Sequence, residues 1–124
     1  MERDIHNRMS QFTFTRISSI DKTNKEFRSL ARSMPSMIQL NGLGATVAFL
    51  CAKKKEGNAH EIMYRLLSDW FNDKACLLPS IRGELIEGIV NLDSDAYRLY
   101  TNESMNLCLW VKRFAEGMID CGEE

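Results

Sequence analysis

The segment 28–55 constrains the fold more than any other part of the chain, because it holds a proline, an Asn-Gly pair and three consecutive lysines among apolar residues. Pro35 lacks a backbone N–H and disfavours the helical conformation of Met34, so we expect an incoming helix to end or bend sharply there. A short helix over 35–41 should then follow. The Asn-Gly pair that ends at Gly42 favours the left-handed conformation that closes a helix C-terminus.

A further helix should start directly after this pair. From Leu43 to Cys51 the apolar residues recur at helical spacing, and the alanines among them let a neighbouring element approach closely. We therefore predict a helix over 44–55. Three lysines occupy its last turn, where the helix macrodipole stabilises cations by about 0.3 to 1 kcal/mol.

The sequence before and after this segment also has helical periodicity. Apolar residues three and four apart predict one long helix over 3–33, with a bend over 18–21 as an alternative. Asn58 is a favoured N-cap residue, and Glu61 follows at the spacing of a capping box. We therefore expect the next helix to begin at this point.

The C-terminal half predicts two more helices. Residues 72–80 have the composition of a connection, and apolar spacing then favours a helix over 81–89. Asp93 or Ser94 should cap a last long helix with a broad apolar stripe, which is typical of a helix at the centre of its domain or under a partner. Strand-like alternation is almost absent, so we predict an all-α, single-domain bundle of five or six helices over 1–124.

Composition excludes several classes of protein. The chain has 124 residues, of which 44% are hydrophobic and 27% charged, as in ordinary globular domains. Its apolar stretches are far shorter than a membrane span, and its first residues lack the apolar core of a signal peptide, so we expect a cytoplasmic protein without a membrane partner. The four cysteines have no close pair spacing, which favours free thiols over a zinc or redox motif.

Charge is distributed unevenly along the chain. Residues 22–65 contain eight basic and three acidic residues, a balance of +5, whereas residues 66–124 contain five basic and eleven acidic residues, a balance of −6. The net charge of −1 argues against a free-standing nucleic-acid binder. A basic half can still lie along phosphates while an acidic half faces protein or solvent, if the fold gathers the charges.

No pattern in the sequence supports catalysis or a bound cofactor. Neither histidine, His6 or His60, belongs to a metal-ligand or triad motif. Two carboxylate pairs at helical spacing lack the histidine or second pair of a dimetal site. These pairs are Glu84 with Glu87 and Glu116 with Asp120. The glycines at 42 and 44 lack the preceding strand and the lysine of a phosphate-binding loop. We expect no metal, cofactor or small-molecule substrate.

The basic residues are the candidates for a binding surface. Arg28 and Arg32 are spaced i, i+4 and should project together from the first helix, while Lys112 and Arg113 should project from the exposed side of the last. A solvated helix face explains each group when it is taken alone. Few exposed aromatic residues are expected for base stacking, and phosphate contact is therefore favoured. The aromatic residues that fall on apolar helix faces are Trp70, Trp110 and Phe114.

Three segments together resemble a known family. They are "LARSMPSMIQLNGLGATVAFLCAKK", "YRLLSDWF" and "YTNESMNLCLWVKRFAEGM". In their order and content they resemble the small subunit of type III-B CRISPR (Cmr) effector complexes. The resemblance covers most of the chain from Phe27 to Met118.

The resemblance implies a subunit that binds without doing chemistry. It would stack in a filament with copies of itself, beside the backbone subunits and other Cmr subunits, and its basic face would line the path of the guide RNA and target RNA. Lys112 and Arg113, together with the cluster of Lys53, Lys54 and Lys55, are the residues that it implies touch the sugar-phosphate chain. Base pairing would supply specificity, and the protein would supply counterion release and shape.

Two other classes of function stay open at this point. The acidic half and the broad apolar stripe of the last helix also fit a helical adaptor that binds protein without RNA. An enzyme that uses a thiolate at Cys51 or Cys108 is a further alternative. It is disfavoured because both cysteines lie on apolar faces, where burial raises the thiol pKa.

Overall fold

The computed structural model describes residues 2–120, with side chains from residue 7 onward, and its regular secondary structure is helical. Six helices follow in the order α1 (Glu2–Ser18), α2 (Lys25–Asn41), α3 (Leu43–Lys53), α4 (Ala59–Trp70), α5 (Leu85–Val90) and α6 (Ser94–Met118). The described residues contain no strand, so the prediction of an all-α bundle of five or six helices is confirmed.

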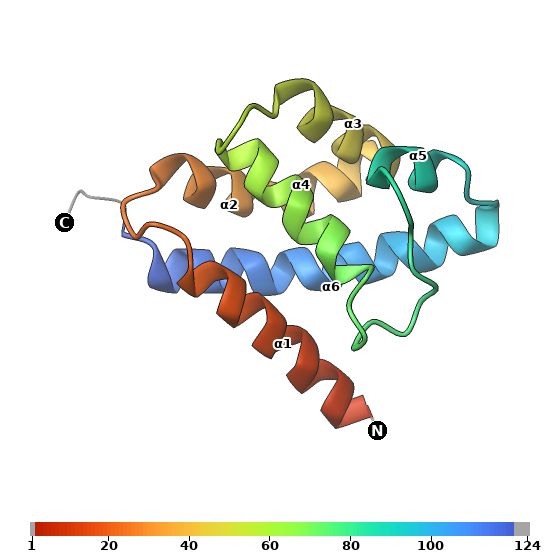
Figure 1. The fold of residues 1–124 in the computed structure, drawn as a ribbon, viewed down its shortest axis with the longest axis horizontal. Coiled ribbons are helices and arrows are strands. Elements are labelled where there is room, and N and C mark those ends of the chain that lie inside the picture. Colours follow the sequence, from red (N-terminus) through yellow and green to blue (C-terminus); the bar gives the residue numbers. More distant parts are fainter. Residues whose placement is uncertain (1, 121–124) are drawn as a thin grey trace.

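The longest helix, α6, runs along the long axis of the molecule, and α2 lies beside it in the opposite direction (Figure 1). α1 crosses the C-terminal part of α6, and α4 crosses the middle of the bundle. α3 packs against α2, α4 and α5, on the side of α2 away from α6. The predicted last helix, α6, therefore lies along one side of the bundle, where α1 and α2 pack against it.

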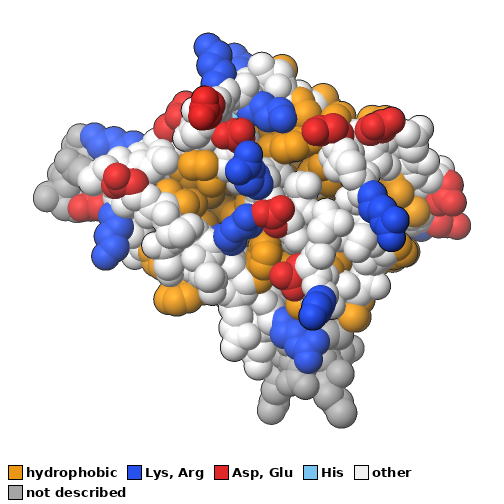
Figure 2. Space-filling model, viewed as in Figure 1, with side chains coloured by type: hydrophobic (Ala, Val, Ile, Leu, Met, Phe, Trp, Pro, Cys, Tyr) orange, Lys and Arg blue, Asp and Glu red, His pale blue; other side chains and the backbone are white. Residues whose placement is uncertain are grey.

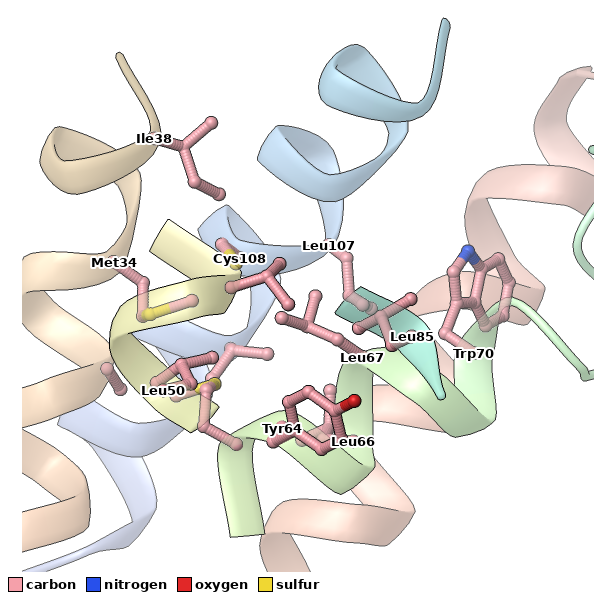
Figure 3. Packing of buried hydrophobic residues seen from close by; sticks show 14 of the residues in the cluster. Met34, Ile38, Leu50, Tyr64, Leu66, Leu67, Trp70, Leu85, Leu107 and Cys108 are labelled. Carbon is pink, nitrogen blue, oxygen red and sulfur yellow. The ribbon is translucent and has the colours of Figure 1, made fainter. Parts of the chain in front are cut away.

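The core forms where five of these helices converge. Figure 3 shows Met34 of α2, Leu50 of α3, Leu67 of α4, Leu85 of α5 and Leu107 of α6 directed into one cluster. Each of these side chains is at most 1% exposed. Because burying a large apolar side chain contributes about 1.5 to 3 kcal/mol, this cluster is the main source of stability for the fold.

Pro35 does not end a helix, so the predicted break at this residue and the separate helix over 35–41 are wrong. It lies inside α2, which continues from Lys25 to Asn41. A proline inside a helix costs about 3 kcal/mol. The residues around it offset this cost, because Met34 and Ile38 are buried on the core face of α2 and each contributes about 1.5 to 3 kcal/mol.

The predicted single helix over 3–33 is also wrong. The chain leaves the helical conformation near 18–21, where the alternative placed a bend, and two separate helices result. α1 ends at Ser18, and a turn leads to α2. The side chain of Asp21 accepts hydrogen bonds from the backbone N–H of Thr23 at 2.9 Å and from its hydroxyl at 2.7 Å. Asn24 then caps α2 by accepting from the N–H of Phe27 at 2.9 Å. These short polar side chains replace helical hydrogen bonds with local ones.

Gly42 closes α2 and opens α3, as the Asn-Gly pair predicts. Its φ of +91° lies in the left-handed region, and its N–H donates to the carbonyl of Ile38 at 2.9 Å. The carbonyl of Gly42 in turn accepts from the N–H of Thr46 at 3.1 Å. The Tyr97 hydroxyl of α6 accepts from the N–H of Gly44 at 2.8 Å, which ties the start of α3 to the long helix.

The helix starts in the second half follow their local signals. Asn58 caps α4 by accepting from the N–H of Glu61 at 2.9 Å, and the Glu61 carboxylate accepts from the N–H of Gly57 at 2.6 Å. Asp93 caps α6 in the same way at Ala96, at 2.8 Å. Both predicted helix starts are confirmed. In a capping box the Glu61 carboxylate would accept from the N–H of Asn58, whereas here it accepts from the N–H of the preceding residue, Gly57.

α5 is shorter than the helix predicted over 81–89. Gly83 has a φ of +76°, and the helix begins only at Leu85. The Tyr64 hydroxyl of α4 accepts from the N–H of Ile86 at 3.3 Å and donates to Glu84 at 2.8 Å. A tyrosine distant in the sequence thus holds the N-terminal turn of α5.

Two glycines in helices predict opposite effects of the same substitution. A Cβ at Gly88 of α5 would lie 2.3 Å from Cγ2 of the buried Ile81, whereas a Cβ at Gly117 of α6 would meet nothing within 4 Å. Replacing Gly88 by alanine should destabilise the fold by about 1 to 3 kcal/mol through overpacking. Gly117→Ala should stabilise it by up to about 1 kcal/mol through helix propensity. Urea unfolding followed by circular dichroism measures both, and equal stabilisation by the two variants would contradict the packing around Gly88.

The position of Pro35 inside α2 yields a second prediction. Pro35→Ala restores a backbone donor and removes a steric conflict. It also raises the conformational entropy of the unfolded chain, which offsets part of this gain, so the net stabilisation of the fold should be about 2 kcal/mol. Pro79→Ala is the control, because Pro79 lies in the connection between α4 and α5. That variant should lose up to about 1 kcal/mol. Thermal unfolding of both proteins checks the signs, and a destabilised Pro35→Ala variant would contradict the cost assigned to this proline.

Candidate nucleic-acid interface

Arg28 and Arg32 of α2 both reach the C-terminal end of α6. The Nη2 of Arg28 donates to the carbonyl of Glu116 at 3.4 Å, and the Nε of Arg32 lies 3.2 Å from the Glu116 carboxylate. The two arginines therefore project together from one face of α2, as their spacing predicts. Their contact with Glu116 results from the antiparallel course of α2 and α6.

Lys112 and Arg113 lie on the same part of α6. Lys112 precedes Glu116 by one helical turn, which places the two side chains on neighbouring positions of the helix surface. Lys112 is half-buried and Arg113 is exposed. The fold thus gathers four of the seven candidate residues near Glu116, and we call Arg28, Arg32, Lys112 and Arg113 the α2–α6 basic cluster.

The α2–α6 basic cluster keeps an exposed cation at Arg32, beside the carboxylate of Glu116. Four cationic residues lie near Glu116, and the side chain of Arg32 is 59% exposed. A solvent-exposed ion pair of this kind contributes about 1 kcal/mol or less, so Arg32 can exchange Glu116 for another anion at little cost. The cluster can therefore bind an anionic ligand with little loss of stability.

Two lysines that the sequence analysis did not single out lie at the same end of the molecule. The N–H of Asp120 donates to the carbonyl of Lys22 at 2.7 Å, which brings the turn before α2 beside the end of α6. Lys25, the first residue of α2, is exposed, as is Lys22. Both lysines contribute to the positive balance of residues 22–65. Their position beside the end of α6, however, depends on the contact between Lys22 and Asp120.

Lys53, Lys54 and Lys55 form a separate group at the end of α3. Lys53 and Lys55 are exposed, while Lys54 is half-buried with its Nζ 4.5 Å from the centre of the Tyr64 ring. A cation over an aromatic face gains about 0.5 to 2 kcal/mol, so Lys54 already has a partner within the fold. The seven candidate residues therefore form two groups, one where α2 lies beside the C-terminal end of α6 and one at the end of α3 (Figure 1).

The face that carries α4 is not a continuous basic surface. Figure 2 shows that its Lys and Arg side chains are interspersed with Asp and Glu. Two of these pairs involve α4, where Arg65 pairs with Glu61 at 3.3 Å and Asp69 pairs with Arg16 of α1. Charges on this face largely neutralise one another.

The two buried cysteines of the described residues, Cys76 and Cys108, are not reactive thiolates. Burial raises the pKa of the Cys108 thiol to about 12. Burial is also the main cause that raises the pKa of Cys76 to about 11, with further contributions from Glu103. Both thiols therefore stay protonated at neutral pH. Cys51 is half-buried on α3.

The remaining candidates for chemistry have structural partners or lie outside the described side chains. The ring of His60 packs edge-on against Phe49, with the ring centres 5.5 Å apart. Glu84 accepts from Tyr64, and the Glu116 carboxylate pairs with Arg32. No group of three or more His, Cys, Asp or Glu side chains that could hold a metal ion occurs among the described residues. The side chain of His6 lies outside the described part.

Trp70, Trp110 and Phe114 all lie against the core, as expected, but they are covered to different extents. Trp70 is fully buried and donates from Nε1 to Glu103 at 2.8 Å. Trp110 and Phe114 are only half-buried, and Phe14 of α1, which the sequence analysis did not consider, is 51% exposed. The hydrophobic residues of a stripe this wide cannot all face the core at once.

Membrane insertion finds no support in the helices. Within the described residues, none of them combines the length and the apolar character that a bilayer span requires.

Comparison with known proteins agrees with this fold over nearly the whole chain. The sequence profile of the CRISPR-associated protein family Cas_Cmr5 matches residues 5–118. The crystal structure of a CRISPR-associated Cmr5 family protein from Thermus thermophilus is similar in fold, with a TM-score of 0.74 and 23% sequence identity. The alignment covers 93% of this chain and 97% of that protein. Since the profile matches most of its length, the protein belongs to the Cas_Cmr5 family of CRISPR-associated proteins, which confirms the resemblance to the small subunit of Cmr complexes.

Proposed function

We propose that this protein is a non-catalytic subunit of a type III-B CRISPR (Cmr) effector complex and that its α2–α6 basic cluster contacts the phosphates of guide or target RNA. The observation that carries the proposal is that Arg28 and Arg32 of α2 converge on Glu116 of α6, close in the helix to Lys112 and Arg113. Membership of the Cas_Cmr5 family supplies the complex in which this surface would act.

The chemistry of the cluster suits a backbone contact. Arginines present forked donors that match phosphate oxygens, and exposed lysines add charge without fixed geometry. Such contacts carry no sequence information and strengthen binding through the release of counterions. Specificity would then come from base pairing between guide and target, and cleavage would fall to another subunit.

Lys53 and Lys55 would contribute a second and weaker contact. Both are exposed at the end of α3, whereas Lys54 is engaged with Tyr64. An RNA that follows the α2–α6 basic cluster would have to pass over α2 to reach them. We therefore assign the principal contact to the cluster around Glu116.

Contacts to neighbouring subunits would use a different surface. An apolar groove lies between the connection after α4, α5 and the first half of α6, and it is lined by Leu78, Ile81, Leu92 and Leu99. Leu99 is 54% exposed, although it is large and apolar. Exposed apolar surface of this kind favours a protein partner, and we propose another Cmr subunit, or a further copy in the expected filament, as its occupant. The adaptor and RNA-binding functions would thus occupy separate faces.

Removing charge from the α2–α6 basic cluster tests the RNA contact. An assembled complex with Arg32, Lys112 and Arg113 replaced by alanine should bind target RNA more weakly, and the slope of log affinity against log salt should fall by about 0.7 for each lost phosphate contact. The control complex carries Arg98→Ala and Lys74→Ala, which remove exposed cations outside the cluster. An unchanged slope in the cluster variant, or an equal loss in the control, would contradict the assignment.

The groove is tested by placing a charge in it. Leu99→Asp should leave the isolated fold intact because the side chain is exposed, yet it should reduce co-purification with the other Cmr subunits, since a carboxylate in an apolar contact costs several kcal/mol. Leu40→Asp is the matched control, because Leu40 is 81% exposed on α2 and does not line the groove. Normal assembly of the Leu99 variant would exclude the groove as a subunit contact.

A further inference from the structure

α1 crosses the C-terminal part of α6 (Figure 1). Three aromatic rings meet at the surface of this crossing. The rings of Trp110 and Phe114 stack with centres 5.5 Å apart and an angle of 20° between their planes. Phe14 of α1 packs edge-on against Phe114, with centres 5.7 Å apart and an angle of 74°. We call Phe14, Trp110 and Phe114 the α1–α6 aromatic cluster.

This cluster is incompletely covered by the fold. Phe14 is 51% exposed, and Trp110 and Phe114 are half-buried. Gly117 follows Phe114 by three residues on α6, and a Cβ there would meet no atom within 4 Å. Among the described residues no atom thus lies against this position of α6, and part of the aromatic surface, above all that of Phe14, faces solvent. A large aromatic surface left open in this way is unusual and indicates a ligand or partner.

The charges around the cluster identify the kind of ligand. Residues 7–20 of α1 and its following turn contain no Asp or Glu, and neither do residues 104–115 of α6. The exposed Arg113 is spaced i, i+3 from Trp110, which makes it a neighbour on the helix surface. The nearest carboxylates on α6 are already engaged, because Glu103 bonds Trp70 and Glu116 pairs with Arg32. Cationic and uncharged polar groups beside partly exposed aromatic rings fit an anionic ligand that also has planar rings. The uncharged hydrogen-bonding groups along the two helices include the exposed Gln11, Ser18 and Asn106.

We propose that the α1–α6 aromatic cluster stacks an unpaired base of single-stranded RNA while Arg113 holds the adjoining phosphate. The proposal rests on the proposed function, because Arg113 belongs to the α2–α6 basic cluster as well. Aromatic rings beside a basic track are how proteins bind single strands without sequence preference, since every base has a stacking face. The strand would cross α6 from the basic cluster on its α2 side to the rings on its α1 side.

Base-bearing and base-free strands separate stacking from phosphate contact. The full-length protein is titrated at low salt with a short oligoadenylate and with an abasic ribose-phosphate strand of equal length. Oligoadenylate should bind at least about five-fold more tightly, the lower end of what one stacked base contributes. It should also quench the fluorescence of Trp110, while Trp70 is buried and does not respond.

Variants of Phe14 locate the effect. Phe14→Ala should lose about five-fold or more of the affinity for oligoadenylate and keep its affinity for the abasic strand, while Phe14→Trp should retain both. Phe49→Ala is the matched control, because Phe49 is 37% exposed and packs edge-on against another ring at 5.5 Å, but on α3. The control should bind both strands as the unaltered protein does.

The outcomes distinguish this inference from the proposed function. Equal affinity for the two strands, or no effect of Phe14→Ala, overturns base stacking. The proposed phosphate contact is then still tested separately, by the salt dependence of RNA binding in the variant of the α2–α6 basic cluster. Binding of neither strand also overturns the inference. If Phe14→Ala instead prevents co-purification with other Cmr subunits in the absence of RNA, the rings form a protein contact and the inference is overturned.

Discussion

α2 and α6 pack side by side in opposite directions, and the other helices are positioned by this contact. The core face of α2 carries Phe27, Ala31, Met34 and Ile38, all at most 2% exposed, and α6 supplies its own buried stripe. α1 covers another flank of α6, while α3 and α4 build on α2. The same pairing brings two arginines to Glu116, so the basic cluster stands on two rigid helices that the core itself holds together.

The features of the fold that the sequence could predict are those whose cause is local. Asn58 and Asp93 cap their helices through bonds to residues three positions on, and Gly42 adopts its left-handed conformation within an Asn-Gly pair. Pro35 is the opposite case. Whether a helix continues through a proline depends on what its neighbours bury against, and for Met34 that includes a core built from residues far along the chain. No window around residue 35 contains this information.

In the candidate site, too, only the features with a local cause could be predicted from the sequence. The i, i+4 spacing of Arg28 and Arg32 is enough to predict that they project together, but their nearness to Lys112 depends on the register of α2 against α6. The ring that engages Lys54 comes from α4. Phe14 was hidden for another reason, since its partner Phe114 lies a hundred residues away and only the crossing of the two helices makes the pair.

Only Gly42 separates α2 from α3, and the direction of α3 is held by the backbone angles of this glycine, by the Tyr97 hydroxyl bonded to Gly44 and by packing against α4 and α5. α3 has 11 residues and therefore acts as a lever about 16 Å long with lysines at its tip. A rotation of about ten degrees at its base would displace those lysines by about 3 Å. The distance between the α2–α6 basic cluster and the lysines at the end of α3 is thus fixed by the rigid start of α3. Any polyanion that contacts both groups would have to match this distance.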